Sequence, residues 1–310
     1  MPKKKVAIFG LGKIGIEYDL DFNYKWIPNQ IKSHVKAVRE SVNFELTYIV
    51  DHNTDKLNKM RRIIGDVESG HTNYILTCQA PDLAIISVPT LEHLKVFQSI
   101  QVAWPNVTCL IEKPMGNSYP EAKNIFKLMV KNKQRIFVNY FRRYLSNFES
   151  LIKSDSFKKR GNLLEVFTCA SGTMKNTFSH FIDLIVLLEG ENAIALENDW
   201  TLISENNRKI VYNRKTNSRF IFQNKDINNL EFYMTLTYKN CSINILENGR
   251  VIRLLDLFGL PIESFELSIE EFNSYQKTVL DKISMRLQEP IDYSQVKNAL
   301  SIQKFIELVD

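Results

Sequence analysis

The sequence predicts an α/β protein with two domains: a doubly wound parallel sheet at the N-terminus, then an α+β domain with an open, largely antiparallel sheet. In the first half of the 310 residues, apolar strand-like runs alternate with helical patterns, which is typical of a parallel sheet with helices on both faces. In the second half, short strand-like runs follow one another across turn sequences, which is typical of hairpins. We place the boundary near residue 120, giving domains of residues 1–120 and 121–310.

The elements of the first half follow from apolar runs and helix signals. Strands are expected at residues 6–9, 46–50, 83–88, 108–111 and 136–138. Helices are expected near residues 54–64, 92–104 and 119–133. The last helix is marked most clearly, because Ser118 and Glu121 form a capping box with Pro120 inside the first turn.

The elements of the second half are mostly strands. They are expected at residues 163–168, 220–222, 232–238, 241–245 and 250–254. Turn sequences at 239–240 and 247–249 separate the last three strands and predict a meander. Helices are expected to follow at 269–287 and 294–308.

A glycine-rich turn directly follows the first predicted strand. The sequence Gly10-Leu11-Gly12-Lys13-Ile14-Gly15 fits the Gly-x-Gly-x-x-Gly pattern of a dinucleotide pyrophosphate site. The first glycine permits the tight turn, the second lets the backbone approach the ligand, and the third lets the following helix pack closely. Free N–H groups at the start of that helix favour an anion. We therefore assign five residues to cofactor binding: Gly10, Gly12, Lys13, Ile14 and Gly15.

Asp51 closes the second predicted strand, where a carboxylate accepts hydrogen bonds from the adenosine ribose. It repels a 2′-phosphate, so NAD is expected rather than NADP. Gly15 and Asp51 are 36 residues apart, whereas about 20 is usual, and we attribute the excess to an insertion around residues 18–28. This segment is interpreted either as a loop over the cofactor or substrate crevice, or as a surface insertion with a buried Trp26.

Composition excludes several classes of function. The chain has 40 Lys and Arg against 35 Asp and Glu, a net charge of +5 without the basic stripe that nucleic-acid binding needs. The four cysteines stand singly, which argues against zinc and disulfides and for a reducing compartment. No signal peptide is recognised, and no apolar run reaches the roughly 18 residues of a membrane helix. We expect a cytoplasmic protein without metal, nucleic-acid or membrane partners.

Unusual residues follow five predicted strands immediately. Besides the glycine turn and Asp51, these are Pro89-Thr90, Glu112-Lys113-Pro114, and Tyr140 with Arg142-Arg143. Ligands of open parallel sheets bind beyond the carboxyl ends of the strands, so one site at this edge is expected.

These segments resemble the Gfo/Idh/MocA oxidoreductases, the family of glucose-fructose oxidoreductase and inositol dehydrogenase. The resemblance spans essentially the whole chain and is carried by residues 9–15, 81–90 with His93, 112–115, 139–144 and 180–183. It implies a Rossmann NAD-binding domain and an enzyme that transfers a hydride between nicotinamide and a CH–OH carbon. The implied substrate is a sugar, sugar acid, nucleotide sugar or cyclitol, and the breadth of the family suggests a role in surface-polysaccharide sugar biosynthesis.

The resemblance also implies roles for individual residues. Lys113 would contact the reacting oxygen and His180 would accept its proton, so both are assigned as catalytic. The remaining cofactor contacts are assigned to Pro89, Thr90, His93 and Glu112, and substrate contacts to Arg143, Tyr144, Asn176 and Asp183.

Three of these assignments carry alternatives. Asn176 stands where many members have an aspartate, and an amide can bind a sugar hydroxyl but cannot accept its proton. Arg143 is expected either to clamp a substrate carboxylate or phosphate or to form an interdomain salt bridge. Asp183 either supports His180 or only pairs with a neighbouring cation.

Two other functions stay open for the chain as a whole. The same fold can use NAD transiently for epimerisation or hydrolysis, or it can bind NAD as a sensor without chemistry. The open sheet predicts a homodimer or homotetramer, and the expected partner is a small carbohydrate-like molecule.

Overall fold

The computed structural model describes residues 2–65, 67–195, 200–205, 207–225 and 232–310. The chain forms two units. The first contains Met1–Phe141 and Asn273–Leu300, and the second contains Arg142–Phe272 and Ser301–Asp310. The first unit continues past residue 120, where the boundary was predicted, because the strand Ile136–Asn139 forms the last strand of its sheet.

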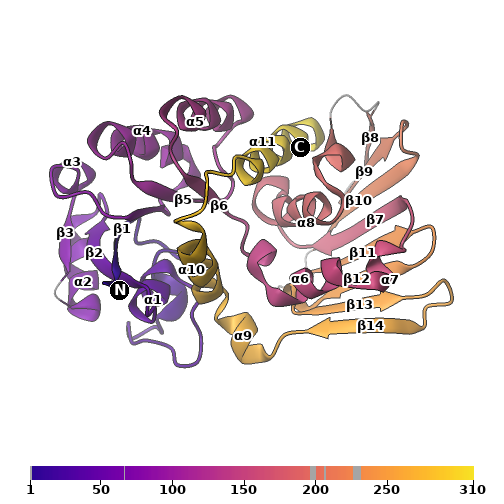
Figure 1. Ribbon diagram of the computed structural model, residues 1–310, viewed down its shortest axis with the longest axis horizontal. Helices are drawn as coiled ribbons and strands as arrows, with labels where there is room; N and C mark the ends of the chain where they lie inside the picture. The colour runs from indigo at the N-terminus through magenta and orange to yellow at the C-terminus, as the bar shows by residue number, and fades with distance from the viewer. Residues whose placement is uncertain (1, 66, 196–199, 206, 226–231) are drawn as a thin grey trace. The chain divides into compact units, whose positions relative to one another are not determined.

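The first unit is built on a six-stranded parallel sheet of order β3-β2-β1-β4-β5-β6 (Figure 1). This is the doubly wound order, as predicted. Its strands are β1 (Lys4–Phe9), β2 (Phe44–Val50), β3 (Glu68–Gly70), β4 (Leu83–Ile86), β5 (Thr108–Glu112) and β6 (Ile136–Asn139). The last apolar residues of five strands are in register with one another: Val50, Phe9, Ile86, Ile111 and Val138. The residues that follow these strands therefore emerge along one edge.

Helices of the first unit pack around this sheet. They are α1 (His34–Arg39), α2 (Thr54–Ile64), α3 (Thr72–Ile75), α4 (His93–Ala103), α5 (Tyr119–Asn132) and α10 (Tyr275–Arg286). The capping box of α5 is present, since the Ser118 side chain accepts a hydrogen bond from the Glu121 N–H. Ala122, Ile125 and Met129 are buried along its inner face.

The helix expected directly after the glycine turn is interrupted. The chain makes one helical turn and a 3-10 segment, Glu17–Asp19, before it loops out. The regular helix α1 begins only at His34, whose N–H donates to the Ile14 carbonyl at 3.0 Å, while the Val35 N–H donates to Gly15 at 2.9 Å. α1 thus stacks on the first turn as a continuation of it. The inserted segment accounts for the long spacing between Gly15 and Asp51.

The second unit contains an eight-stranded sheet of order β14-β13-β12-β11-β7-β10-β9-β8. Its neighbours pair antiparallel except for β7 with β10, as expected of an open, largely antiparallel sheet. The strands are β7 (Leu163–Ala170), β8 (Trp200–Glu205), β9 (Arg208–Asn213), β10 (Ser218–Asn224), β11 (Tyr233–Tyr238), β12 (Ser242–Leu246), β13 (Val251–Leu255) and β14 (Pro261–Glu266). Three of these strands were not predicted from the sequence: β8, β9 and β14. β8 and β14 expose apolar as well as polar residues, whereas only Arg208 of β9 is exposed.

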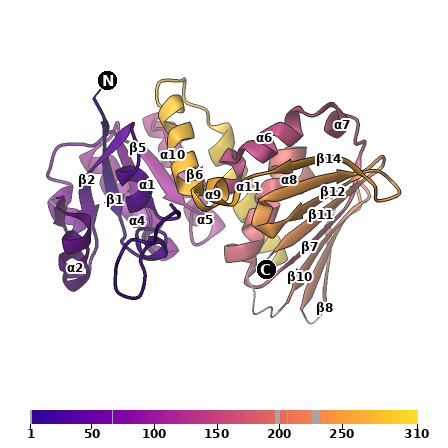
Figure 2. The ribbon, with the colours of Figure 1, turned by 90° about the horizontal axis from the view of Figure 1, so that it is seen from below.

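Helices cover one face of this second sheet (Figure 2). They include α6 (Ser146–Lys153), α7 (Asp155–Lys158) and α8 (Ser179–Glu189). The end of α11 (Ser294–Val309) packs on the same face, where Phe305 contacts Phe220 and Trp200. The helix expected at 269–287 is divided into α9 (Ile269–Asn273) and α10 at Ser274, whose backbone is not helical.

Candidate active site

The glycine turn has the geometry of a phosphate-binding loop. Gly10 has a φ of 97°, and a Cβ there would lie 2.6 Å from the backbone of Ser87 and Val88. A Cβ on Gly15 would lie 2.2 Å from the Gly10 oxygen. Gly12 is different, because a Cβ on it would meet nothing within 4 Å. Two glycines therefore let the protein pack on itself, and the third faces open space that suits the close approach of a pyrophosphate.

Asp51 lies beside this turn. Its Oδ2 accepts a hydrogen bond from the Leu11 N–H at 2.9 Å, and its Oδ1 accepts one from the Asn53 N–H at 3.0 Å. The residue is 9% exposed. An ionised carboxylate has about four lone-pair positions, so both oxygens retain capacity for ribose hydroxyls. The pair of Asp51 and the glycine turn therefore fits a dinucleotide.

The loop after β4 is tied to the loop after β5 through His93. Its Nε2 lies 3.0 Å from the Val88 carbonyl oxygen, and its Nδ1 lies 3.1 Å from that of Pro114. Burial lowers the pKa of His93, although these carbonyls and the charge of Glu112 act in the opposite direction. The ring of His93 thus joins the loop after β4 to the loop after β5. At the same edge of the sheet, Pro89 is exposed and Thr90 is half-buried.

Glu112 is buried in a hydrogen-bond network that the sequence analysis did not foresee. Its Oε1 lies 2.7 Å from His34 Nε2 and accepts a hydrogen bond from Asn139 Nδ2 at 2.6 Å. Burial raises the pKa of Glu112, but the hydrogen bonds from His34 and Asn139 and the charge of Lys113 outweigh it, so its pKa is lowered. The contacts given by the structure tie Glu112 to the protein, whereas the sequence analysis assigned it to the cofactor.

Lys113 follows Glu112 at the end of β5. It is half-buried and is joined to Pro114 by a cis peptide bond. The first unit therefore collects the glycine turn, Asp51, Thr90 and Lys113 along the carboxyl ends of neighbouring strands. The common edge follows from the strand order, and the roles of these residues stay predictions.

Arg143 and Asp183 form a buried ion pair within the second unit. Arg143 Nε donates to Asp183 Oδ1 at 2.5 Å, and the two side chains are 11% and 1% exposed. Burial raises the pKa of Asp183 to about 6, against the opposing influence of the Arg143 charge. Asp183 thus pairs with a neighbouring cation, and the salt bridge of Arg143 lies inside one unit.

The remaining predicted residues also lie in the second unit. His180 is half-buried near the start of α8, three positions before Asp183. Asn176 is exposed in a π-helical turn, Met174–Phe178, and Tyr144 is buried. Because Lys113 belongs to the first unit and His180 to the second, their action on one substrate stays a prediction.

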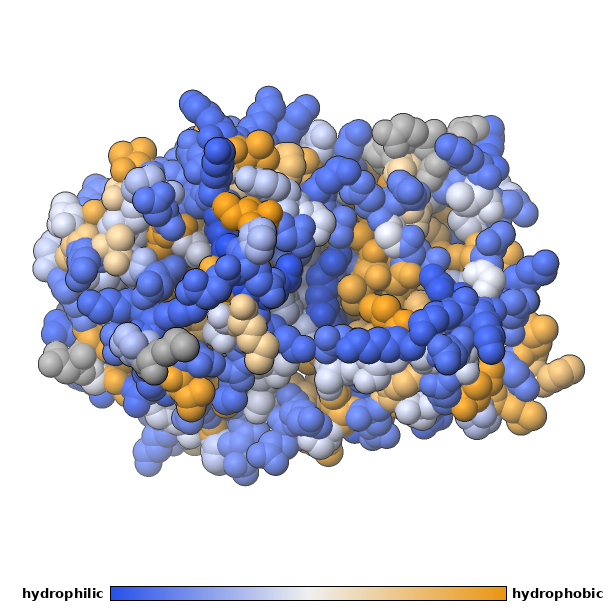
Figure 3. All heavy atoms as spheres, in the orientation of Figure 1, coloured by the Kyte–Doolittle hydropathy of each residue, from blue (hydrophilic) through white to orange (hydrophobic). Residues whose placement is uncertain are grey.

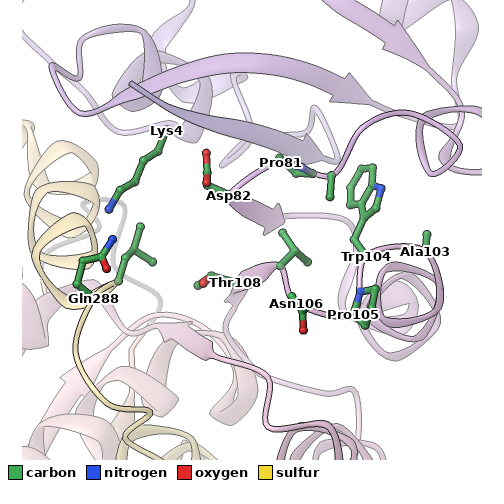
Figure 4. A pocket seen from close by; sticks show the side chains of 12 residues that line it. Lys4, Pro81, Asp82, Ala103, Trp104, Pro105, Asn106, Thr108 and Gln288 are labelled. Carbon is green, nitrogen blue, oxygen red and sulfur yellow. The ribbon is translucent and has the colours of Figure 1, made fainter. Parts of the chain in front are cut away.

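A cavity of about 350 Å³ lies elsewhere in the first unit (Figure 4). Lys4, Asp82 and Thr108 line it near the amino ends of β1, β4 and β5. This is the edge opposite the glycine turn, so the cavity is separate from the candidate site. None of the helices in the described part of the chain combines the length and apolar character that crossing a membrane requires.

Comparisons with solved structures agree with the fold. KijD10, a 3-ketoreductase from Actinomadura kijaniata in complex with TDP-benzene and NADP, has a TM-score of 0.76 at 11% identity, over 99% of this chain and 97% of that one. The WlbA dehydrogenase from Bordetella pertussis, in complex with NADH and UDP-GlcNAcA, has a TM-score of 0.69 at 16% identity, over 97% and 93%. At these identities the likeness shows the fold alone.

Sequence comparisons give the family. No curated protein sequence matches the chain. Residues 4–140 match the model of an oxidoreductase family with an NAD-binding Rossmann fold. This match covers the parallel sheet and all the strand ends that form the candidate site. Residues 4–140 therefore form an NAD-binding Rossmann domain of the Gfo/Idh/MocA oxidoreductase family.

Proposed function

We propose that the protein is an NAD-dependent oxidoreductase that transfers a hydride between nicotinamide and a CH–OH carbon of a carbohydrate-like substrate. The observation that carries the proposal is the glycine turn, whose Gly12 faces open space beside the carboxylate of Asp51. Lys113 follows β5, which is separated from β1 by β4, at the same edge of the sheet. A dinucleotide on the turn would direct its nicotinamide along this edge.

The chemistry requires two transfers from the alcohol. Oxidation of a CH–OH carbon removes a hydride from the carbon and a proton from the hydroxyl. A bound nicotinamide dinucleotide accepts the hydride. We assign to the Lys113 ammonium the stabilisation of negative charge on the substrate oxygen, and to His180 the acceptance of its proton. Asn176, Tyr144 and the Arg143–Asp183 pair are proposed to shape the substrate site.

The proposed substrates are sugars and nucleotide sugars. KijD10 was solved with TDP-benzene, and WlbA with UDP-GlcNAcA, so the same fold holds nucleotide-linked ligands in two proteins. Asn176, as an exposed amide, suits hydrogen bonding to a hydroxyl. NAD is proposed in preference to NADP because Asp51 presents a carboxylate where a 2′-phosphate would have to lie.

The test is Lys113→Ala with Lys95→Ala as the matched control, since the Lys95 side chain is 81% exposed on α4. Substrates are sought by screening nucleotide sugars, sugar acids and polyols with NAD⁺ or NADH, following absorbance at 340 nm. We expect Lys113→Ala to lose turnover at least about a hundredfold while it still binds NADH, because a charge-stabilising group is removed from the reacting oxygen. Lys95→Ala should match the wild type. A wild type that binds no dinucleotide, or a Lys113→Ala variant with full turnover, contradicts the proposal.

We also propose a homodimer or homotetramer that uses the open face of the second sheet. Four apolar side chains on neighbouring strands form a row on this face: Phe167, Ile221, Ile210 and Ile203. The helices that pack on this sheet in the described part of the chain lie on one of its faces (Figure 2), and Phe220, which contacts Phe305 of α11, neighbours Ile221 on β10 and so points to the face opposite the row. Apolar residues of the turn between β13 and β14 are also exposed, where the right end of Figure 3 shows an apolar patch. Light scattering of the wild type and an Ile203→Glu variant tests the assembly, and a monomeric wild type contradicts it.

A further inference from the structure

His34 connects two parts of the candidate site that are far apart in the sequence. It begins α1 and is completely buried. Its backbone N–H donates to the Ile14 carbonyl of the glycine turn at 3.0 Å, and its imidazole Nε2 donates to Glu112 Oε1 at 2.7 Å. One residue therefore holds the loop after β1 and the end of β5, directly before Lys113.

The Glu112 end of this connection is a buried polar network. Asn139 Nδ2 donates to Glu112 Oε1 at 2.6 Å and lies 3.3 Å from Gln276 Oε1. The four side chains come from α1, β5, β6 and α10, and none is more than 8% exposed. Hydrogen bonds to a buried carboxylate are strong and directional, so the network fixes where β5 ends.

The inserted segment holds the chain directly before His34. Asp19 is completely buried, and its Oδ2 accepts hydrogen bonds from the Ser33 N–H at 2.7 Å and the Ser33 hydroxyl at 2.6 Å. The Ile27 N–H donates to the Asp19 carbonyl at 2.8 Å and closes the loop. Ser33 is also the N-cap of α1. The insertion is thus fastened at its base, directly before His34.

We propose that His34 is a positioning residue that keeps the end of β5, and with it Lys113, in register with the glycine turn. The inference rests on the proposed function, because it gives His34 a role in aligning the dinucleotide loop with the residue assigned to the substrate oxygen. His34 acts through Glu112 and the backbone of the turn. It is not proposed to touch the substrate.

The ionisation of Glu112 reports on this arrangement. The titratable groups that interact with it are His34 from α1, Lys113 directly after β5, Tyr18 from the inserted segment and His93 from α4. Burial raises the pKa of Glu112, and the hydrogen bond and charge of His34 are the next largest influences. Without His34, burial is opposed only by Asn139 and Lys113, so Glu112 should bind a proton at higher pH.

The experiment compares wild type with His34→Leu, His34→Gln and Gln134→Leu. Glutamine retains a side-chain N–H donor, whereas leucine removes it. Gln134, which lies near the amino end of β6, is the matched control. It is 2% exposed, and its side chain donates a hydrogen bond to the Val107 carbonyl. Two quantities are measured: the titration of the Glu112 carboxyl by carbon-13 NMR of glutamate-labelled protein, assigned with Glu112→Gln, and the affinity for NADH by fluorescence.

In wild type the titration midpoint should lie below the ordinary value of 4.5. In His34→Leu it should rise by about one pH unit or more, with NADH binding weakened about tenfold. His34→Gln should recover most of both effects, and Gln134→Leu should leave both at wild-type values.

A His34→Leu variant with an unchanged Glu112 midpoint and unchanged NADH affinity overturns the inference, as does an equal effect of Gln134→Leu. The titration needs neither cofactor nor substrate. If wild type binds no NADH, the proposed function fails, while the Glu112 midpoint still decides whether His34 controls that carboxylate. Circular dichroism shows which variants are folded. If His34→Leu does not fold, the inference is judged on His34→Gln, which should keep the Glu112 midpoint and the NADH affinity close to the wild-type values.

Discussion

The glycine turn gives a prediction in which two similar substitutions have different results. A Cβ on Gly15 would lie 2.2 Å from the Gly10 oxygen and 3.0 Å from Leu11 Cα, and both of these are backbone atoms. An ordinary contact needs more than about 3.4 Å, so the backbone must move by roughly 1 Å. We expect Gly15→Ala to lower the free energy of unfolding by about 3 kcal/mol.

Gly12→Ala should behave in the opposite way. Its Cβ would meet nothing within 4 Å, and Gly12 has no positive φ, so the free energy of unfolding should change by less than about 1 kcal/mol. The new methyl group would occupy the space proposed for the pyrophosphate. NADH affinity should fall at least about tenfold.

The assay for both variants is urea unfolding combined with fluorescence titration of NADH. A Gly12→Ala variant that is stable and binds NADH as tightly as wild type refutes the placement of the pyrophosphate on this turn. A Gly15→Ala variant as stable as wild type refutes the packing argument and leaves the ligand argument untouched.

Three further outcomes are expected. Asp51→Asn retains an oxygen that accepts the hydrogen bond of the Leu11 N–H but removes the negative charge, so it should reduce the preference for NADH over NADPH. The control is Asp82→Asn at the opposite edge of the sheet, where the carboxylate accepts a hydrogen bond from the Lys5 N–H, and it should leave that preference unchanged. Asp183 has a folded-state pKa of about 6, above the ordinary 3.8, so its contribution to stability is complete below pH 3.8 and is lost as pH rises through 6. Urea unfolding should therefore show wild type losing about 3 kcal/mol relative to Asp183→Asn between about pH 4 and pH 7, and a flat difference would contradict this. Asp19→Ala leaves the buried Ser33 N–H and hydroxyl without their acceptor and should cost about 2 kcal/mol or more in the same assay, while Asp21→Ala in the exposed part of the loop should cost less.

Much of the fold could be predicted because its signals are local. β1, β4 and β5 are nearly continuous apolar runs, as strands buried on both faces must be. Four consecutive residues, starting at Ser118, predict the start of α5. By contrast, β8 and β14 lie at the two edges of their sheet, where apolar and polar residues alike are exposed, so neither the helical nor the strand period of apolar residues marks them.

The candidate site could be predicted only in part, for a related reason. Glycines, Asp51 and Lys113 stand in short motifs, and their common edge follows from strand direction alone. The partner of Glu112 does not, because His34 lies 78 positions away and its pattern is that of an ordinary helical residue. The insertion after the first turn was predicted from the long spacing between Gly15 and Asp51, but the hydrogen bonds from residues 34 and 35 to residues 14 and 15, which stack α1 on that turn, leave no local trace in the sequence.

The first turn and α1 stack as one helix, so the chain between them does not have to keep a fixed length. Because the Ile27 N–H bonds to the Asp19 carbonyl, residues added or deleted between Asp19 and Ile27 leave the spacing between the first turn and α1 unchanged. Segments of different length can therefore be exchanged here without altering the glycine turn, which makes this part of the chain suitable for grafting.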